Sequence, residues 1–353
     1  MKRFQIRWWC PSAYASGRRE TALGARQTSE VCMSEAGLVT IIMPNRNHAH
    51  YLPRALDAML AQTWTKLEII VVDDASSDSS RSVVVDYEKR DPRVRLLALN
   101  EHHGINRAVN TALAITRGEF VHIAGADDFV EPIFVERCVA EMNRNPDAGL
   151  SFSDPTEFHE QGQRAIRFPL YLNDCSIYYD RATLIDLFKR NYFHISANTG
   201  LYRMSAFREA GGYRPELLWL CDWFATLVIA LRHGACYLPE QLTYLTIRSD
   251  SYSGRNLRNA KAQWPLLEQV LRLLASPEYS DVAPGMRSAG LIPEDQLRTL
   301  YWLLANSEGR KFIRPHLIGR VFCRYIWSFF RPLVPPHWRR RLRQMQSERA
   351  HVA

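Results

Sequence analysis

From Leu38 onward, short apolar runs alternate with segments whose apolar residues recur at helical spacing. The apolar runs predict strands at 38–44, 67–74, 94–100 and 119–128. The segments between them predict helices at 51–63, 77–90 and 105–118, the last one ended by Gly118. Strands that alternate with helices pair in parallel and are covered on both faces. The pattern therefore predicts an α/β fold with a mostly parallel, Rossmann-like sheet, whose ligands bind outside the carboxyl ends of the strands.

Two pairs of adjacent carboxylates stand at the ends of these predicted strands. Asp73 and Asp74 end the second strand, and Asp127 and Asp128 end the fourth. In a parallel sheet all four would face one crevice, where unpartnered burial costs several kcal/mol per charge. A divalent cation or donors on a ligand would offset that cost. An Asp after a strand can instead cap a helix or form a turn, which is the interpretation we adopt for Asp78.

The composition fits a folded intracellular protein. Of the 353 residues, 46% are hydrophobic, and no run of about 18 uncharged apolar residues indicates a membrane span. The seven cysteines are scattered without a C-x-x-C pair, which favours a reducing, cytoplasmic location. Residues 1–36 show no sustained period and predict a flexible leader. Either Met33 is the natural start or the leader is a real extension.

The net charge of +8 is concentrated in the tail. From Arg310 onward there are eleven Lys or Arg and one acid, so the other 309 residues carry 34 basic and 36 acidic groups. A nucleic-acid enzyme more often carries basic charge across its working face. We therefore expect no nucleic-acid partner.

Several motifs together carry a family resemblance. "VTIIMPNRNHAHYLPRALDAMLAQTWTKLEIIVVDDASSDSS", "GINRAVNTALAITRGEFVHIAGADDFVEP" and "TGLYRMSAFREAGGYRPE" follow in this order. Over residues 37–254 the chain resembles glycosyltransferase family 2, inverting enzymes with a GT-A fold. The resemblance implies a nucleotide-sugar-binding half at 37–150 and an acceptor-binding half at 151–255. A helical, basic C-terminal extension would occupy 256–353.

The resemblance implies a metal-dependent sugar transfer. Asp127 matches the last position of the D-x-D motif and would bind Mg²⁺ or Mn²⁺, with Asp128 as the second candidate. Such a cation stabilises the charge on a departing diphosphate. The first Asp of the motif is Gly125 here, which leaves a carboxylate contact to the ribose in doubt.

The resemblance also implies a donor site. Asp74 would accept an N–H from the base, Pro44 to Asn47 would wrap base and ribose, and Gly200 would lie under the donor sugar. Cations and a helix N-terminus would bind the diphosphate, although Arg46 and Arg107 could equally be solvated surface residues. The complete donor-binding set is Pro44, Arg46, Asn47, Asp73, Asp74, Asn106, Arg107, Gly200 and Arg248.

Inversion requires a general base beside the acceptor hydroxyl. Asp222 matches the Asp of the family's Glu-Asp pair, and Cys221 replaces the Glu. A positioned base contributes roughly 10²–10⁴-fold. Asp222 could also be the N-cap of the following helix, since Asp is a good N-cap.

The segment 312–343 combines apolar residues at helical spacing with arginines, and Pro332 ends the helix. A basic aromatic helix of this kind can lie in an anionic membrane surface. The alternative is a helix packed on the domain with solvated arginines. We expect a cytoplasmic protein, peripheral on the inner face of the cell membrane.

The expected partners are a nucleotide-diphospho-sugar, with a UDP-sugar preferred, and a glycan or polyprenyl-linked acceptor. A non-catalytic sugar-nucleotide-binding module is the alternative, because Gly125 and Cys221 both depart from acidic positions. A nucleotidyltransferase is a weaker alternative, because the chain lacks an early Gly-rich, basic phosphate loop.

Overall fold

The computed structural model describes residues 34–160, 163–191, 193–248, 260–293 and 297–330. Most of the predicted leader and the tail after Phe330 lie outside the described residues. The strands are β1 (Glu35–Asn45), β2 (Leu67–Asp74), β3 (Val94–Leu99), β4 (Gly118–Ile123), β5 (Phe129–Val130), β6 (Leu150–His159), β7 (Arg164–Arg167), β8 (Ile177–Tyr179), β9 (Gly200–Arg203) and β10 (Ala235–Ile247). The helices are α1 (Leu52–Leu60), α2 (Ser80–Arg90), α3 (Ile105–Leu113), α4 (Phe134–Arg144), α5 (Arg181–Arg190), α6 (Met204–Glu209), α7 (Cys221–His233), α9 (Ala260–Ala275), α10 (Ala283–Ser288), α11 (Leu297–Ala305), α12 (Ser307–Arg310) and α13 (Pro315–Phe330). Short 3₁₀ turns are η2 (Ala197–Thr199), η3 (Pro215–Leu220) and η4 (Pro277–Tyr279).

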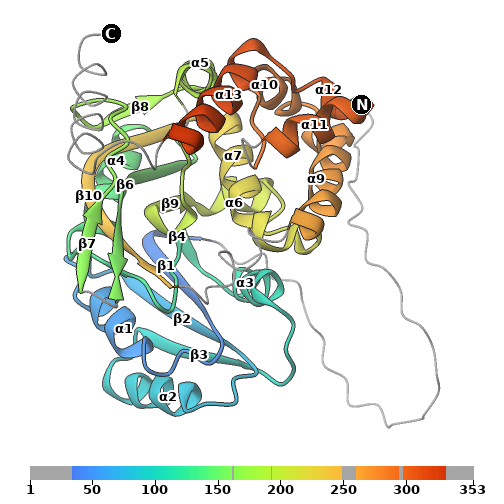
Figure 1. Ribbon diagram of the computed structural model, residues 1–353. Helices are drawn as coiled ribbons and strands as arrows, with labels where there is room; N and C mark the ends of the chain where they lie inside the picture. Colours follow the sequence, from blue (N-terminus) through green and yellow to red (C-terminus); the bar gives the residue numbers. More distant parts are fainter. Residues whose placement is uncertain (1–33, 161–162, 192, 249–259, 294–296, 331–353) are drawn as a thin grey trace, which may run out of the picture. The chain divides into compact units, whose positions relative to one another are not determined.

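All described strands join one sheet in the order β3-β2-β1-β4-β9-β6-β10-β5, with β7 beside β6 and β8 beside β10. The first four strands are parallel to one another, as predicted. β2 is apolar on both faces: Ile69 and Val71 pack with α1 and α4, whereas Ile70 and Val72 pack with α3 and α7. Helices cover both faces (Figure 1). The predicted α/β fold with a mostly parallel sheet is therefore confirmed.

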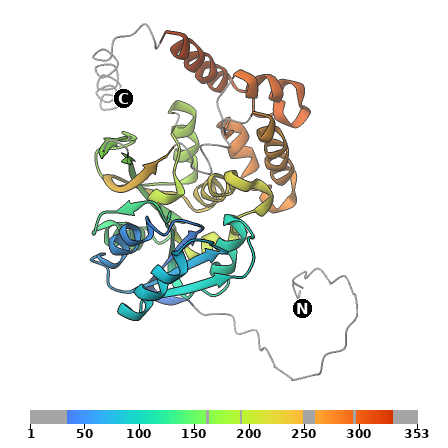
Figure 2. The same cartoon turned by 60° about the horizontal axis from the view of Figure 1, so that its bottom comes forward.

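The second part of the sheet mixes directions. β9 runs antiparallel between β4 and β6, while β6 and β10 are parallel. The predicted helical C-terminal region is present as α9 to α13, coloured orange to red in Figures 1 and 2. One hydrophobic cluster continues from Ile42 through Phe152 and Phe224 to Leu317. The core thus crosses the boundaries predicted at residues 150 and 255, and the division into donor and acceptor halves remains a prediction.

In the part of the chain that the structure describes, no helix combines the length and apolar character needed to cross a membrane.

Two predicted boundaries were wrong. α3 ends at Leu113, and Gly118 opens β4 instead of ending the helix. A Cβ at Gly118 would lie 2.4 Å from Oγ1 of Thr40, so close strand packing explains this glycine. β4 ends at Ile123, and Asp127 and Asp128 lie in the turn that follows, closed by a bond from the Asp128 N–H to the Gly125 carbonyl (3.2 Å).

Candidate active site

The carboxyl ends of β1, β2 and β4 bring polar side chains to one edge of the sheet. Asn45 ends β1 opposite Asp73 of β2, and Asp74 is the last residue of β2. The turn with Asp127 and Asp128 follows β4. Because β1 lies between β2 and β4, about 10 Å separates the two strands. Both carboxylate pairs therefore belong to the same edge, which we call the carboxyl edge.

Asp73 is fully buried and paired within the protein. Its carboxylate accepts bonds from Nε of Arg81 (2.6 Å), from the Ser76 N–H (3.1 Å) and from Nδ2 of Asn45 (3.0 Å). Burial alone would raise the pKa of Asp73, but these bonds outweigh burial and hold the pKa below its usual value. Asp73 therefore braces the turn after β2, and its predicted donor contact remains a prediction.

Asp74 fixes the loop that leads into α3. Its carboxylate accepts from the backbone N–H groups of His103 (2.7 Å) and Gly104 (2.9 Å), and it lies 2.7 Å from Nδ1 of His102. A carboxylate offers about four lone-pair sites, so one remains for another donor. The predicted contact of this carboxylate with a nucleotide base remains a prediction.

Asp127 and Asp128 lie side by side in different surroundings. Asp127 faces the guanidinium of Arg248 at 3.3 Å and keeps 19% of its side chain exposed. Asp128 accepts bonds from the Thr246 N–H (2.7 Å) and from Nδ2 of Asn198. Burial, and then the charge of Asp127, raise the pKa of Asp128 to about 7. Asp127 is thus paired with Arg248, whereas Asp128 is buried and held by hydrogen bonds.

Gly125 explains how Asp128 reaches its place. A Cβ at residue 125 would lie 2.4 Å from Oδ2 and 2.9 Å from Cγ of Asp128. The carboxylate of Asp128 therefore occupies the space that a side chain at residue 125 would need. The departure from the D-x-D motif at Gly125 makes room for another acid.

These two carboxylates fit a hard divalent cation. Carboxylate oxygens are its preferred protein ligands, and a cation would offset the burial of charge and the repulsion from Asp127, which together raise the pKa of Asp128. Among the described residues, no group of three or more His, Cys, Asp or Glu side chains could hold a metal ion. Ligand phosphates and water would therefore complete the coordination of a cation at Asp127.

Other polar residues surround Asp127 that the sequence reasoning missed. Arg54 donates to the Asp127 carbonyl (2.8 Å) and to Oγ1 of Thr246 (3.0 Å), with its guanidinium stacked 4.7 Å from the ring of Phe129. A terminal nitrogen of Arg248 lies 3.3 Å from Nε2 of His48. Arginine only donates, so this His48 nitrogen accepts, and burial lowers the pKa of His48.

The sequence offered some signals for these residues. Asn198 lies two residues before Gly200, which the resemblance places under the donor sugar, and Thr246 stands two residues before Arg248. His48 and Arg54 had no motif of their own. Their place at the site follows from bonds between distant segments.

The remaining donor-side candidates divide by exposure. Arg46 and Arg107 are exposed. Asn47 adopts φ of 56°, and its Oδ1 accepts from the Ser77 N–H (2.8 Å). Pro44 pairs with Val72 in the sheet, and buried Gly200 accepts a bond from Nδ1 of His122 through its carbonyl (2.8 Å). The donor roles of all five remain predictions.

Asp222 lies in the first turn of α7, half-buried. Leu220 is the N-cap of α7, and Oδ1 of Asp222 accepts from the N–H of its neighbour Trp223 (2.7 Å), so Asp222 is not the N-cap. Burial raises the pKa of Asp222, and the charge of His194 opposes this shift. A carboxylate with a raised pKa is a stronger base, which suits proton removal from a hydroxyl.

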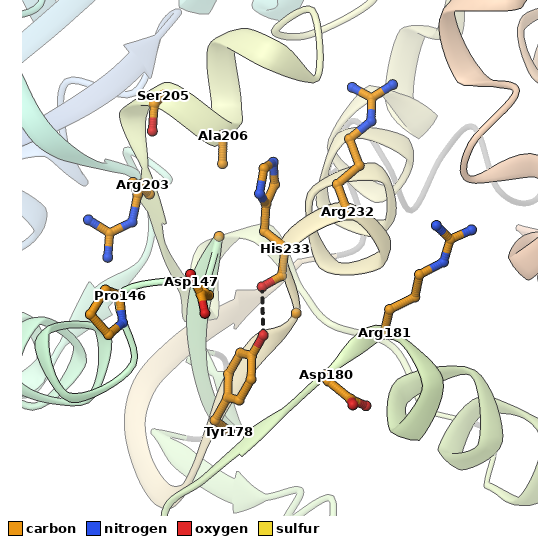
Figure 3. Close-up of a pocket in the computed structure, with 12 residues that line it drawn as sticks. Pro146, Asp147, Tyr178, Asp180, Arg181, Arg203, Ser205, Ala206, Arg232 and His233 are labelled. Carbon is orange, nitrogen blue, oxygen red and sulfur yellow. Dashed lines mark hydrogen bonds between the residues drawn. The ribbon is translucent and has the colours of Figure 1, made fainter.

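A polar hollow lies elsewhere in the described part of the chain. Figure 3 shows it between Asp147, Tyr178, Arg203 and His233, with a volume of about 510 Å³. Gly149 and Gly234, which directly precede the parallel strands β6 and β10, also line it. The hollow therefore lies at the amino edge of the sheet, opposite the carboxyl edge.

Comparisons with known proteins agree with this geometry. The family model for glycosyl transferase family 2 matches residues 40–211. A chondroitin synthase of Escherichia coli is 30% identical over 137 residues, which are 38% of this chain and 20% of that protein. The chain thus spans about a fifth of this curated relative.

Solved structures resemble most of the chain. TarS residues 1–349 of S. aureus in complex with UDP has a TM-score of 0.53 at 18% identity, covering 84% of this chain and 85% of that one. Mannosyltransferase PcManGT of Pyrobaculum calidifontis with GDP-Man and Mn²⁺ has a TM-score of 0.53 at 17% identity, covering 89% and 86%. The family model thus assigns residues 40–211 to glycosyl transferase family 2, and the solved structures show a GT-A fold.

Proposed function

We propose that this protein is a metal-dependent, inverting glycosyltransferase. It moves a sugar from a nucleotide-diphospho-sugar to a hydroxyl of a glycan or lipid-linked acceptor, as in the synthesis of cell-surface polysaccharides. The observation that carries the proposal is the turn with Asp127 and Asp128 at the carboxyl edge, where Asp127 faces Arg248 and the buried Asp128 has a raised pKa. The chondroitin synthase among the relatives supports a polysaccharide product.

In the proposed reaction, Asp222 takes the proton of the acceptor hydroxyl. The acceptor oxygen forms a bond to the anomeric carbon while the bond from that carbon to the diphosphate oxygen breaks. This single displacement inverts the anomeric centre. The raised pKa of Asp222 strengthens it as a base, and protonation ends its role until the proton passes to solvent.

The diphosphate requires positive charge. A Mg²⁺ or Mn²⁺ ion held by Asp127, with Asp128 beside it, would supply charge stabilisation for the leaving group when bound. Arg248 already lies 3.3 Å from Asp127, so its guanidinium can bind phosphate oxygens in the same place. On the other side of β1, Asp74 keeps an acceptor site for the base. Arg46 and Arg107 are exposed and free to approach a ligand.

We propose a UDP-sugar as the donor. The likeness to a TarS structure with UDP supports this choice, while the likeness to PcManGT with GDP-Man keeps GDP-sugars in the comparison. A thermal-shift panel of UDP-, GDP- and dTDP-sugars, with and without Mn²⁺, tests it. Stabilisation by a UDP-sugar that needs Mn²⁺ is expected, and stabilisation by a GDP- or dTDP-sugar alone would reject it.

The non-catalytic alternative is tested by Asp222→Asn. This change keeps the size of the side chain and removes the base. Release of nucleoside diphosphate from the donor should fall by about 10²-fold or more, whereas the Kd of the donor should stay within about twofold. If the wild type releases no nucleotide with any sugar of the panel, or if the variant releases it at the wild-type rate, the proposed catalysis is wrong.

We also propose that the protein lies on an anionic membrane surface through 312–343, on the cytoplasmic side. Leu317 and Val321 of α13 are buried in the core, yet Ile318, Phe322 and Tyr325 of the same helix are 46%, 61% and 54% exposed. The neighbouring α11 adds Leu297, Tyr301 and Leu304, exposed at 53%, 77% and 53%. Both alternatives for this helix thus receive support, since one side packs on the domain and another presents apolar residues.

We call these exposed residues of α11 and α13 the α11–α13 face. The charge of the tail favours an anionic lipid surface as the partner of this face. Eleven basic residues and one acid follow from Arg310, which matches an anionic bilayer better than a second copy of the same basic segment. The double variant Phe322→Ser, Tyr325→Ser should lose co-sedimentation with phosphatidylglycerol vesicles. Phe168→Ser, at a 36% exposed aromatic outside this face, is the matched control. Unchanged sedimentation of the double variant would reject the membrane proposal.

A further inference from the structure

The segment that leads into α7 is held by two side chains of α3. Asn110 bonds both backbone groups of Tyr213, accepting from its N–H (2.9 Å) and donating to its carbonyl (2.6 Å). Asn106, four residues earlier and so on the same helix face, donates from Nδ2 to the carbonyls of Leu218 (2.9 Å) and Arg214 (3.4 Å). Two side-chain amides of α3 therefore hold the backbone of residues 213–218.

The thiol of Cys221 completes the bonding of Asn106. Its Sγ lies 2.9 Å from Oδ1 of Asn106, and burial raises the pKa of the thiol well above its usual value, so the thiol keeps its proton and donates. Asn106 is only 5% exposed. Its oxygen accepts from the thiol and its nitrogen donates to two carbonyls. The side chain is thus committed to the segment before Asp222.

The backbone of this segment is strained. Leu218 adopts φ of 47° and ψ of −117°, a conformation that a residue with a side chain rarely adopts. The side chain of Leu218 is 44% exposed, so core packing does not hold it. The Leu218 carbonyl accepts from Nδ2 of Asn106 and from the backbone N–H of Cys221, so these two bonds stabilise this conformation.

The N-terminal end of α3, which carries Asn106, is also fixed at the donor side. Asp74 accepts from the N–H groups of His103 and Gly104 in the loop just before the helix. α3 thus joins a donor-side carboxylate to the segment that carries Asp222. One short helix thus contacts both the donor-side carboxylate and the segment before Asp222.

We propose that Asn106 and Cys221 are positioning residues, whose mutual bond and whose grip on Leu218 hold Asp222 at the acceptor hydroxyl. The resemblance implied that Asn106 binds the donor. We propose instead that Asn106 acts on the acceptor side. The inference rests on the proposed role of Asp222 as the general base. It also gives a function to the cysteine that stands where the family has a glutamate.

The test compares Asn106→Ala and Cys221→Ala with Cys221→Ser, which keeps a donor for Asn106. The readouts are kcat for nucleotide release from the selected donor, the Kd for UDP with Mn²⁺, and the pH profile of kcat. In Asn106→Ala, kcat should fall about tenfold or more, since a misplacement of 1 Å can cost about 10²-fold. The Kd for UDP should not change.

The pH profile separates positioning from a merely structural role. If residues 214–222 loosen, water reaches Asp222 and its pKa falls, so the acid limb of the kcat profile moves to lower pH in both alanine variants. Cys221→Ser should stay within about twofold of the wild type, because its hydroxyl still donates. Thr111→Ala, on the exposed side of α3, is the control for helix damage and should match the wild type.

Three outcomes would overturn the proposal. Folded alanine variants could retain the wild-type kcat and acid limb, Cys221→Ser could fall as far as Cys221→Ala, or Asn106→Ala could weaken the Kd for UDP with an unchanged kcat. The cysteine pair answers the question even if Asn106→Ala does not fold. If Asp222→Asn keeps its turnover, the proposed base is wrong; if only that variant loses turnover, the base stands and the positioning role is wrong.

Discussion

The two edges of the sheet are both rich in charge, yet they differ in how that charge is balanced. In the hollow at the amino edge, Arg203 pairs with Glu119 at 3.2 Å and Arg232 pairs with Asp281 at 2.8 Å. At the carboxyl edge, Asp127 faces Arg248 at 3.3 Å, but Asp128 is held by hydrogen bonds, and burial followed by the charge of Asp127 raises its pKa to about 7. Arg203 and Arg232 of that hollow are thus paired with acids of the protein. The candidate active site is marked instead by Asp128, a buried carboxyl group with a raised pKa beside the Asp127–Arg248 pair.

The largest expected difference between the edges is in turnover. Asp127→Asn removes the carboxylate best placed for a cation, so nucleotide release should fall by about 10²-fold or more. Asp147→Asn, the matched change in the amino-edge hollow, should leave release unchanged. Steady-state kinetics with Mn²⁺ measure both. Equal losses would show that the edges do not differ in function.

Gly125→Ala should have the next largest effect. The new Cβ would displace the flexible carboxylate of Asp128, so the apparent affinity for Mn²⁺ and the turnover should each fall by about tenfold, by the general scale of misplaced groups. The fold should persist, because the displaced atoms end a side chain. Gly319→Ala in α13 meets nothing within 4 Å and should instead stabilise the protein by up to about 1 kcal/mol. A wild-type Mn²⁺ response in Gly125→Ala would contradict the account of this turn.

The smallest effect concerns the pH dependence of stability. Between its usual pKa of 3.8 and about 7, Asp128 holds a proton in the folded protein that the unfolded chain releases. The free energy of unfolding therefore falls as pH rises through this window. Without added cation, the Tm of Asp128→Asn should fall less between pH 5 and pH 7.5 than the Tm of the wild type. Parallel Tm curves for the two proteins would show that the pKa of Asp128 is not raised in the folded protein.

The sequence predicted the sheet well because its strands are apolar on both faces. β2, fully buried, reads as a strand without knowledge of its neighbours. The end of α3 was misplaced because Gly118 is required by Thr40 of another strand, and local pattern contains no such information. The antiparallel insertion of β9 between β4 and β6 likewise depends on distant pairing.

Site residues could be predicted from the sequence where they belong to a motif. They could not be predicted where only a hydrogen bond between distant segments places them at the site. Asp127 and Asp222 were predicted from the resemblance, and their roles remain to be tested. The packing of Asp128 into the space beside Gly125 needed coordinates, as did the grip of Asn106 on Leu218. Asn106 looked like a diphosphate ligand from the start of a helix, but its side chain turns toward Cys221.

The most direct test of the central claim is a crystal structure of Asp222→Asn with an intact UDP-sugar and Mn²⁺. We expect Mn²⁺ at about 2.1 Å from a carboxylate oxygen of Asp127, the nucleotide base near Asp74 and the anomeric carbon facing residue 222. A nucleotide in the amino-edge hollow, or a sugar whose anomeric carbon points away from residue 222, would contradict it.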